Sequence, residues 1–402
     1  MDSLTLDKVY HAAYVLKSVA RKTDLIHAAG LCPDCDLYLK TENLQVTGSF
    51  KVRGAYYKIS QLTEEEKSKG VIASSAGNHA QGVALAAKEN GIPCVICMPD
   101  GAPISKVEAT KAYGAKVCLV KGAYDDAYDY ACELQEKEGY TFIHPFNDPE
   151  VIAGQGTIGL EILDQLSDVE VVLVPVGGGG LISGVAYAIK KLHPECRVYG
   201  VQAAGSASME QSLKQHEPIT LETAATFADG IAVKHPGDLT FELVSKYVDG
   251  VVTVTDDETA CAILALMEKQ KLVTEGAGAV AVAAAMFGKV DIRGKKTVCL
   301  LSGGNIDVNI LSRVISRGLT IAGRNSTLTL QLEDKPGQLT DVSEIISRNG
   351  GNVVRVHYNQ ADPNLAITSC YLTLSIETRD GEQVEKIKKD LAASGFQLVS
   401  HT

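Results

Sequence analysis

Short apolar segments alternate with longer amphipathic segments along most of this chain, from about residue 37 to residue 317. Val171-Val172-Leu173-Val174 is typical of the short segments, which are apolar from end to end. Such strands are buried on both faces, as in a parallel sheet covered by helices. The alternation therefore predicts an α/β protein with parallel sheets, whose functional loops lie at the carboxyl ends of the strands. The predicted strands are residues 37–40, 71–73, 94–98, 116–120, 171–176, 197–202, 251–254 and 297–301, and the predicted helices are one within residues 1–30 and residues 80–90, 104–113, 124–138, 152–165, 181–191, 257–271 and 308–317.

The pattern changes after Arg324. Residues 327–332 alternate between apolar and polar side chains, which is typical of a half-exposed strand. A helix over residues 339–349, strands over 352–358 and 367–377, a helix over 382–393 and a strand over 396–400 follow. The order βαββαβ predicts a ferredoxin-like domain after a linker near residues 323–326.

The charge balance argues against two classes of partner. The net charge is −11, and the chain has no block rich in Lys and Arg, so we expect no binding to nucleic acid or to an anionic membrane. The first residues lack a basic segment followed by an apolar one, so no secretory signal is expected. The apolar run 276–288 is too short and too rich in Ala and Gly for a membrane span. We expect a cytoplasmic protein.

Ten cysteines are scattered along the chain and are expected to be reduced thiols. Two Cys-x-x-Cys pairs, Cys32/Cys35 and Cys94/Cys97, could in principle hold zinc. The second pair lies in a predicted strand, where residues three apart point to opposite faces. We therefore expect no metal site.

One lysine stands out by its surroundings, in Thr47-Gly48-Ser49-Phe50-Lys51-Val52-Arg53-Gly54. Gly48 permits a turn, and Ser49 is expected to cap the helix that follows. A lysine near a strand end and beside an aromatic ring can be partly desolvated, lose its proton and form a Schiff base with an aldehyde. The alternative is an ordinary surface lysine in a turn.

Three loops follow predicted strands and carry the remaining chemistry. Residues 74–82 lead into a helix whose N-terminus could bind a carboxylate, and Asn78 in this loop could donate to a phenolate-like oxygen. The alternative is an ordinary turn that caps the helix. Four consecutive glycines in residues 175–184 suit a single phosphate group, or form a flexible turn. In residues 299–305, the Ser302 hydroxyl could bond a ring nitrogen without charging it, or cap a helix. Together with Lys51, these features describe a site for pyridoxal phosphate.

The chain resembles the threonine dehydratases (threonine ammonia-lyases) of the fold-type II family, which depend on pyridoxal phosphate and here carry an appended ACT regulatory domain. The resemblance rests on Ser49–Gly54, Ser75–His79, the glycine loop and Ser302–Asn305, with support from His144–Asp148 and Ala228–Ala232. It implies that Lys51 forms the Schiff base, Phe50 flanks the ring, Asn78 binds the ring 3-oxygen and Ser302 meets the ring nitrogen. It further implies the following site residues: for the phosphate Gly177, Gly178, Gly179, Gly180 and Leu181, and for the substrate Ser75, Ala76, Gly77, Asn78, His79 and Asn147.

The resemblance also sets the expected domains. Residues 1–325 would form the catalytic domain, with a smaller subdomain at about 46–150 inserted in a larger one, and residues 326–402 the ACT domain. ACT modules bind an amino acid across a dimer of modules, which implies a homo-tetramer or dimer with an amino-acid effector. The expected effector residues are Asp334, Pro336, Gly337, Gln338, Leu339 and Asn352.

The reaction implied is elimination of water from L-threonine, and from L-serine, to give 2-oxobutanoate or pyruvate and ammonia. Serine racemase shares these motifs, but racemases of that type have a serine where this chain has Ala76. They also bind a divalent cation through acidic residues in the segment that here is Gln202–Ser208, which has no carboxylate. A non-catalytic amino-acid sensor is a further alternative, which an intact Lys51 disfavours.

Overall fold

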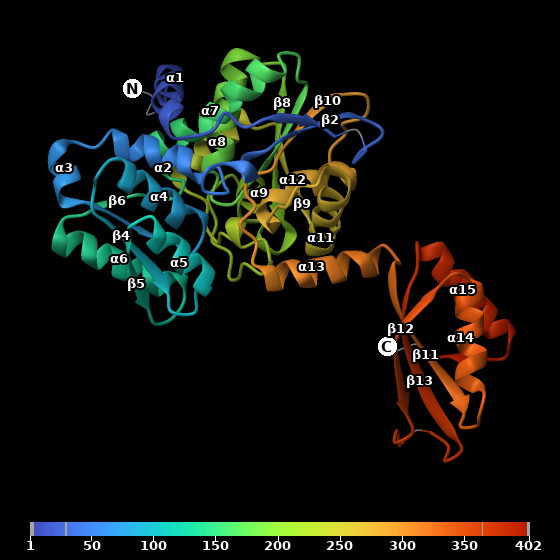
Figure 1. Ribbon diagram of the computed structural model, residues 1–402. Helices are drawn as coiled ribbons and strands as arrows, with labels where there is room; N and C mark the ends of the chain where they lie inside the picture. The colour runs from blue at the N-terminus through green and yellow to red at the C-terminus, as the bar shows by residue number, and fades with distance from the viewer. Residues whose placement is uncertain (1–3, 29, 364, 400–402) are drawn as a thin grey trace. The chain divides into compact units, whose positions relative to one another are not determined.

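The computed structural model describes residues 4–28, 30–363 and 365–399. The chain divides into two compact units, residues 1–308 and 309–402 (Figure 1). The second unit therefore includes nearly all of helix α13 (Val308–Ile321), whereas the domain boundary expected at residues 325 and 326 falls at the start of strand β11 (Asn325–Glu333). Among the described residues, no helix is long and apolar enough to cross a membrane.

The first unit contains a six-stranded sheet with the strand order β1-β2-β10-β7-β8-β9. Strand β1 is antiparallel to β2, and the other neighbours are parallel. Helices α7 and α8 bury Val172 and Val174 on one face. Because side chains alternate along a strand, Leu173 points to the opposite face, on which α12 packs. The strands are β1 (Leu25–His27), β2 (Asp36–Lys40), β7 (Val171–Pro175), β8 (Arg197–Ala203), β9 (Gly250–Val254) and β10 (Lys296–Leu300), and the helices beside them are α1 (Leu6–Val15), α7 (Pro149–Gln165), α8 (Gly180–Leu192), α9 (Ser208–Gln215), α10 (Asp238–Tyr247), α11 (Asp256–Ala265) and α12 (Gly276–Met286).

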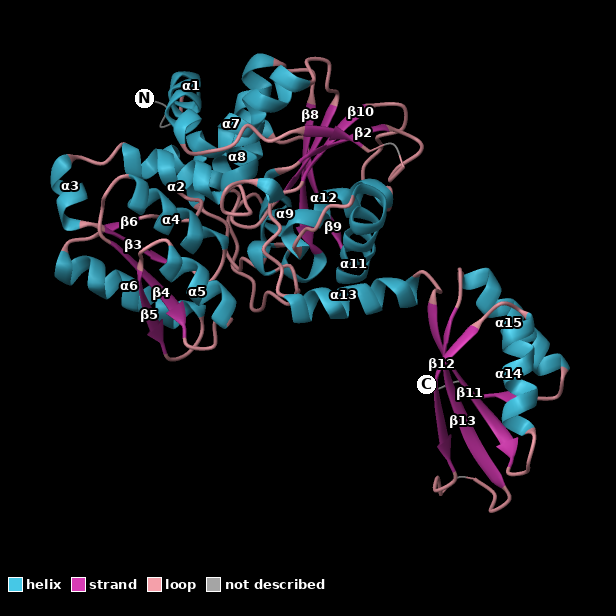
Figure 2. Cartoon of the chain, in the orientation of Figure 1, coloured by secondary structure: helices cyan, strands magenta, loops and turns pink. Residues whose placement is uncertain are grey.

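A second, four-stranded parallel sheet has the order β5-β4-β3-β6 and takes all its strands from residues 71–142 (Figure 2). Helices α2 and α4 cover one face, and α6 covers the other. Cys94 belongs to the first of these cores and Cys97 to the second, so the two thiols point to opposite faces of the sheet. The elements are β3 (Val71–Ser74), β4 (Cys94–Pro99), β5 (Lys116–Val120), β6 (Thr141–Phe142), α2 (Lys51–Ser60), α3 (Glu64–Lys69), α4 (Asn78–Glu89), α5 (Ile104–Ala112) and α6 (Tyr124–Glu138).

The second unit carries an antiparallel sheet with the order β12-β13-β11-β14, and helices α14 and α15 both lie on one face of it (Figure 2). After α13, its elements are β11, α14 (Gln338–Arg348), β12 (Asn352–Asn359), β13 (Ser369–Glu377), α15 (Gly381–Ala393) and β14 (Gln397–Leu398). Alternate residues of β13, from Cys370 to Ile376, point into the core beneath the helices. The βαββαβ order predicted from the sequence is therefore confirmed.

Every strand predicted in the larger unit is present, with ends that differ by one or two residues at most. Several elements had not been predicted: β1, β6, α3, α9, α10, α12 and the short helices η1 (Leu16–Ser18), η2 (Glu42–Leu44), η3 (Ala204–Ser206) and η4 (Asp229–Ile231). The helix predicted over residues 257–271 ends at Ala265 and continues as a π-helical turn, η5 (Leu266–Gln270). Helix α12 escaped prediction because it is apolar and buried on all sides, so it has no polar face to reveal its period.

Candidate active site

Lys51 is the first residue of α2, and the turn before it is fastened to the loop after β10. The amide of Phe50 donates to the carbonyl of Ser302 (3.1 Å), and the amide of Gly304 donates to the carbonyl of Gly48 (2.8 Å). The expected helix cap at Ser49 is wrong. Phe50 occupies the N-cap position, and the buried Ser49 hydroxyl has no hydrogen-bond partner among the described residues. Backbone bonds to residues 302–304 hold the start of the helix instead.

The Lys51 side chain is half-buried at the start of α2. Its amine donates a hydrogen bond to the carbonyl of Pro145 (3.0 Å) and lies 5.3 Å from the centre of the Phe50 ring. Desolvation lowers the pKa of Lys51 to about 8, although the charge of Glu275 acts in the opposite direction. Near neutral pH, the neutral and nucleophilic form of the amine is therefore more populated in Lys51 than in an ordinary lysine.

The glycine loop follows β7 and leads directly into α8. Gly179 has a φ of +98°, which favours glycine. A Cβ atom on Gly178 would lie 2.4 Å from the ring of Phe146, and one on Gly180 would lie 2.7 Å from the Cβ of Phe146. The backbone can therefore approach the neighbouring segment only because these residues are glycines. The first amides of a helix have no partner within the helix, so the start of α8, including Leu181, offers donors to an anion.

The loop after β3 ends at Asn78, the first residue of α4. The amide of Gly77 donates to the Ser75 hydroxyl (3.1 Å) and tightens the turn. The side-chain amide of Asn78 donates to Glu275 (Nδ2 to Oε1, 2.6 Å), and Asn305 donates to its oxygen (Nδ2 to Oδ1, 2.8 Å). Asn305 belongs to the loop after β10, so two of the three predicted loops meet through these side chains.

Two histidines next to Lys51 are held neutral. His79 donates through Nε2 to the carbonyl of Ile143 (2.7 Å), and burial together with the Lys51 charge lowers its pKa to about 3. His144 accepts from the amides of Phe146 and Asn147 through Nδ1, and burial together with the Lys51 charge lowers its pKa to about 4. These bonds shape the segment that presents the Pro145 carbonyl to Lys51.

Two predicted site residues already have partners of their own. The Ser302 hydroxyl donates its single hydrogen to the carbonyl of Ala277 in α12 (3.2 Å), so it must rotate away from that carbonyl to donate to a ring nitrogen. The side-chain oxygen of Asn147 accepts from the amide of Leu239 at the start of α10 (3.1 Å). The structure thus brings Lys51, Phe50, Asn78 and Ser302 into one continuous network, whereas the Asn147 oxygen is directed toward α10.

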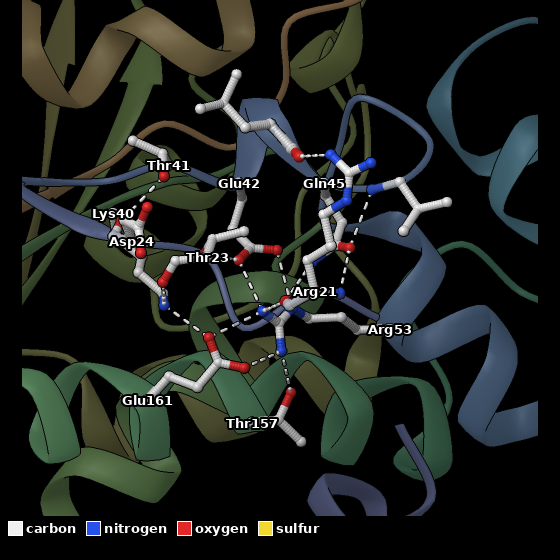
Figure 3. A network of polar contacts seen from close by, with 12 residues as sticks. Arg21, Thr23, Asp24, Lys40, Thr41, Glu42, Gln45, Arg53, Thr157 and Glu161 are labelled. Atoms are coloured by element: carbon white, nitrogen blue, oxygen red, sulfur yellow. Dashed lines mark hydrogen bonds and ion pairs between the residues drawn. The ribbon is translucent and has the colours of Figure 1, made fainter. Parts of the chain in front are cut away.

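A buried network of charges lies beneath the first turn of α2 (Figure 3). Arg53 contacts Glu42 through Nε and Nη2 (2.8 Å each) and Glu161 through Nη1 (2.6 Å). Lys40 completes the network with a bond from Nζ to Glu161 (2.6 Å). Burial acts to raise the pKa of Glu42, but the charge and hydrogen bonds of Arg53 lower it overall. Two cations therefore face two carboxylates, and the network anchors the helix that carries Lys51.

A cavity of about 690 Å³ borders this network, beside α1 and α7. Arg53, Thr157 and Glu161 contribute to its wall. Its described lining does not include Lys51, Asn78 or Ser302, so it is separate from the loops above.

Comparison with known proteins identifies the chemistry that these loops share. A family model described as "Pyridoxal-phosphate dependent enzyme" matches residues 16–303. The chain belongs to this family. It is 51% identical to an L-threonine ammonia-lyase of Thermotoga maritima over 98% of this chain and 99% of that protein.

Two solved structures resemble the chain closely. The processed form of threonine deaminase isoform 2 from Solanum lycopersicum matches with a TM-score of 0.73 and 40% identity, over 78% of this chain and 89% of that one. Maize serine racemase matches with a TM-score of 0.74 and 35% identity, over 79% of this chain and 99% of that one. The fold is therefore that of the fold-type II enzymes, which depend on pyridoxal phosphate.

The residues present fit this cofactor. Lys51 offers an amine of lowered pKa to the aldehyde. The glycine loop packs directly against Phe146, and the start of α8 that follows it offers backbone amides to a phosphate. The Ser49 hydroxyl is buried without a partner in the described chain, so it is available to bond a polar group of the cofactor.

Proposed function

We propose that the chain catalyses the elimination of water from L-threonine and L-serine, giving 2-oxobutanoate or pyruvate and ammonia. The observation that carries this proposal is the 51% identity, over nearly its whole length, with a protein named L-threonine ammonia-lyase. The lowered pKa of the Lys51 amine supports it, because a sensor without catalysis would need no such amine.

Each side chain has a proposed role. Lys51 holds the cofactor aldehyde, Gly177 to Leu181 bind its phosphate, and Phe50 lies against the ring. Asn78 donates to the ring oxygen, and Ser302 faces the ring nitrogen. When bound, the cofactor withdraws electrons from the substrate α-carbon. Lys51 is then the base, and its Nζ takes the α-proton; the bond to Pro145 limits where that atom can lie.

The loop of residues 75–78 is proposed to hold the substrate carboxylate at the N-terminus of α4. His79 and Asn147 support this loop and its neighbour rather than moving protons, because His79 stays neutral and the Asn147 oxygen is bonded to Leu239. The Ser302 hydroxyl carries no charge, so it does not supply a fixed negative charge to the ring nitrogen. A weaker electron sink favours rapid elimination over slower side reactions.

Racemisation is the second candidate, favoured by the likeness to maize serine racemase. Ala76 has no hydroxyl that could return a proton from the opposite face. In the segment 202–208, the Gln202 side chain accepts from the amide of Glu210 (2.8 Å), and the Ser208 hydroxyl donates to the carbonyl of Val233 (2.8 Å). These groups are neutral and supply no carboxylate to a divalent cation.

We also propose that residues 326–402 form an ACT module that binds an amino acid and pairs with a second copy. Strand β12 is an edge strand, and its Val354, Val356 and Tyr358 are 54%, 45% and 38% exposed. An exposed apolar edge favours pairing with another strand. The effector would bind at the turn of residues 334–339, which precedes α14. Asn352 lies away from this turn, because it pairs with Glu377 at one end of β13, whereas Glu333 pairs with Ser369 at the other end.

A steady-state assay tests the catalytic proposal. Purified protein with pyridoxal phosphate is given L-threonine or L-serine, and the 2-oxo acid is measured together with the chirality of the remaining amino acid. The proposal predicts a 2-oxo acid and ammonia in equal amounts. D-serine as the main product would favour the racemase instead.

A further inference from the structure

Glu275 is a buried residue next to the proposed cofactor site, and only 4% of its surface is exposed. It occupies the N-cap position of α12, and its backbone amide donates to the carbonyl of Gly303 (3.1 Å). Its side chain does not cap the helix but accepts from Asn78. A buried carboxyl placed in this way requires an explanation, because burying a charge is costly.

Hydrogen bonds link the Thr47 carbonyl, Asn305, Asn78 and Glu275 in series, and the Thr47 carbonyl determines which group donates in each bond. The Thr47 carbonyl can only accept, so the Asn305 group 2.8 Å from it must be the amide nitrogen. The same nitrogen donates its other hydrogen to Asn78 Oδ1. The Asn78 oxygen is therefore the acceptor, and its nitrogen donates one hydrogen to Glu275. One N–H of Asn78 is left for a further acceptor.

Two glycines make room for the Glu275 carboxyl. A Cβ atom on Gly303 would lie 2.3 Å from Glu275 Oε1, and one on Gly230 would lie 3.3 Å from it. Gly303 directly follows Ser302, the residue proposed to face the ring nitrogen. The carboxyl therefore sits between the loop after β10 and the loop that contains η4, at a place that a larger residue would close.

We propose that Glu275 is a positioning residue, which orients and polarises the Asn78 amide and so sets how strongly the cofactor ring oxygen holds a proton. The inference rests on the proposed function, in which the remaining N–H of Asn78 faces that oxygen. A carboxylate accepts this bond more strongly than a neutral group does, and hydrogen bonds that share one amide polarise each other.

Several charged groups act on Glu275. The pKa of Glu275 is raised to about 7, first by burial and then by the charge of Asp229, although Asn78, Lys106 and Lys51 act to lower it. Lys106 itself is paired with Asp229 (Nζ to Oδ2, 2.6 Å). With these groups around it, Glu275 exchanges its proton close to neutral pH, and the bond to Asn78 is strongest above that range.

The test is a pH titration of the absorbance of the bound cofactor in the holoenzyme, without substrate. The wild-type protein is expected to have a transition near pH 7 that Glu275→Gln lacks, because glutamine accepts from Asn78 but does not titrate. Glu275→Asp, which keeps an ionisable group, should retain a transition, displaced in pH. Glu258→Gln, a carboxylate on α11 paired with Lys289, is the matched control and should titrate like the wild type.

Kinetics give a second measurement. Glu275→Gln should lower kcat by about 10- to 100-fold, as expected for weakening a hydrogen bond to a charged group, with little change in KM. Identical absorbance titrations of the wild type and Glu275→Gln would overturn the inference. So would a Glu275→Asp protein that titrates like Glu275→Gln. Because the titration needs no substrate, a different catalysed reaction would leave its result intact.

Discussion

Arg53 donates two hydrogen bonds to the Glu42 carboxylate, from Nε and from Nη2 (2.8 Å each), and both side chains are almost wholly buried. Arg53 stands two residues after Lys51, in the first turn of α2, while Glu42 belongs to η2. The pair therefore ties the helix that carries the proposed catalytic amine to the loop after β2.

Removing one partner of this network should be costly. Arg53→Met removes the guanidinium that contacts both Glu42 and Glu161 and leaves Lys40 paired with Glu161 alone, and a buried carboxylate that loses its charged partner is strongly unfavourable. We expect a loss of about 3–5 kcal/mol in the free energy of unfolding, measured with urea. Arg53→Lys should lose less, because it keeps the charge without the two-nitrogen geometry. Lys22→Met, which breaks an exposed pair with Asp164, serves as the control and should change little.

The sequence predicted the three loops and Lys51 because short motifs at strand ends hold their own geometry. Four glycines in a row permit the close approach to Phe146 whatever lies elsewhere in the chain. The network around Arg53 could not be predicted in this way. Its partners Glu42 and Glu161 are far apart in the sequence, and only the packing of α7 against α2 brings them together.

Glu275 escaped prediction for a similar reason. It stands before an all-apolar helix, in Thr274-Glu275-Gly276, and no periodicity or spacing marks it. A lone acidic residue before a run of small apolar residues reads as an ordinary helix start. The available signal is weak: Glu275 is the last charged residue before a long uncharged run. The error at Ser49 has the opposite origin, since a good capping residue was displaced by backbone bonds to the loop after β10.

Replacing Lys51 should abolish turnover. Lys51→Ala removes both the attachment of the cofactor aldehyde and the proposed base, so the loss should exceed the ~10²–10⁴-fold effect of removing a general base alone. Production of 2-oxobutanoate from L-threonine measures it. Lys69→Ala, at an exposed lysine of α3, is the control. Near-normal production by the Lys51 variant would show that the amine is not needed.

The lowered pKa of Lys51 predicts how the cofactor-free protein takes up pyridoxal phosphate. Only the neutral amine attacks the aldehyde, so the rate should rise with pH and become constant above a pH of about 8. A lysine with the ordinary pKa of 10.5 would give a rate that still rises well above that point. Rapid-mixing absorbance measures the rate. Pyridoxal, which has no phosphate to titrate, should give the same pH profile if Lys51 is responsible.

The glycine loop predicts a steric effect on cofactor affinity. Gly178→Ala places a Cβ atom 2.4 Å from the Phe146 ring, a clash expected to cost about 1–3 kcal/mol. The dissociation constant of pyridoxal phosphate should rise by about 5- to 150-fold. Adding Phe146→Leu should recover part of this loss. Gly101→Ala, where no atom lies within 4 Å of the added Cβ, is the matched control. Unchanged affinity in Gly178→Ala would mean that the loop does not need this close approach.

Regulation can be tested by removing residues 325–402, the ferredoxin-like part of the second unit. A chain that ends at residue 324 keeps the whole segment matched by the family model, residues 16–303, and should retain the dehydratase reaction. Maize serine racemase supports this expectation, because 99% of that chain aligns with only 79% of this one. The shortened chain loses β11 to β14, including the apolar edge at Val354 and Val356, and should form smaller oligomers.

An amino acid bound at residues 334–339 can change catalysis only if it binds two states of the assembly with different affinity. We expect isoleucine or valine to shift the kinetics of the full-length protein by a coupling of about 1–3 kcal/mol, which is about 5- to 150-fold in affinity. The shortened chain should not respond. Steady-state titrations of both proteins with isoleucine and valine, together with their masses in solution, separate the two possible roles of the unit. If the shortened chain forms a smaller oligomer and neither protein responds to isoleucine or valine, the removed domain serves assembly alone. That result would exclude control by these branched-chain amino acids.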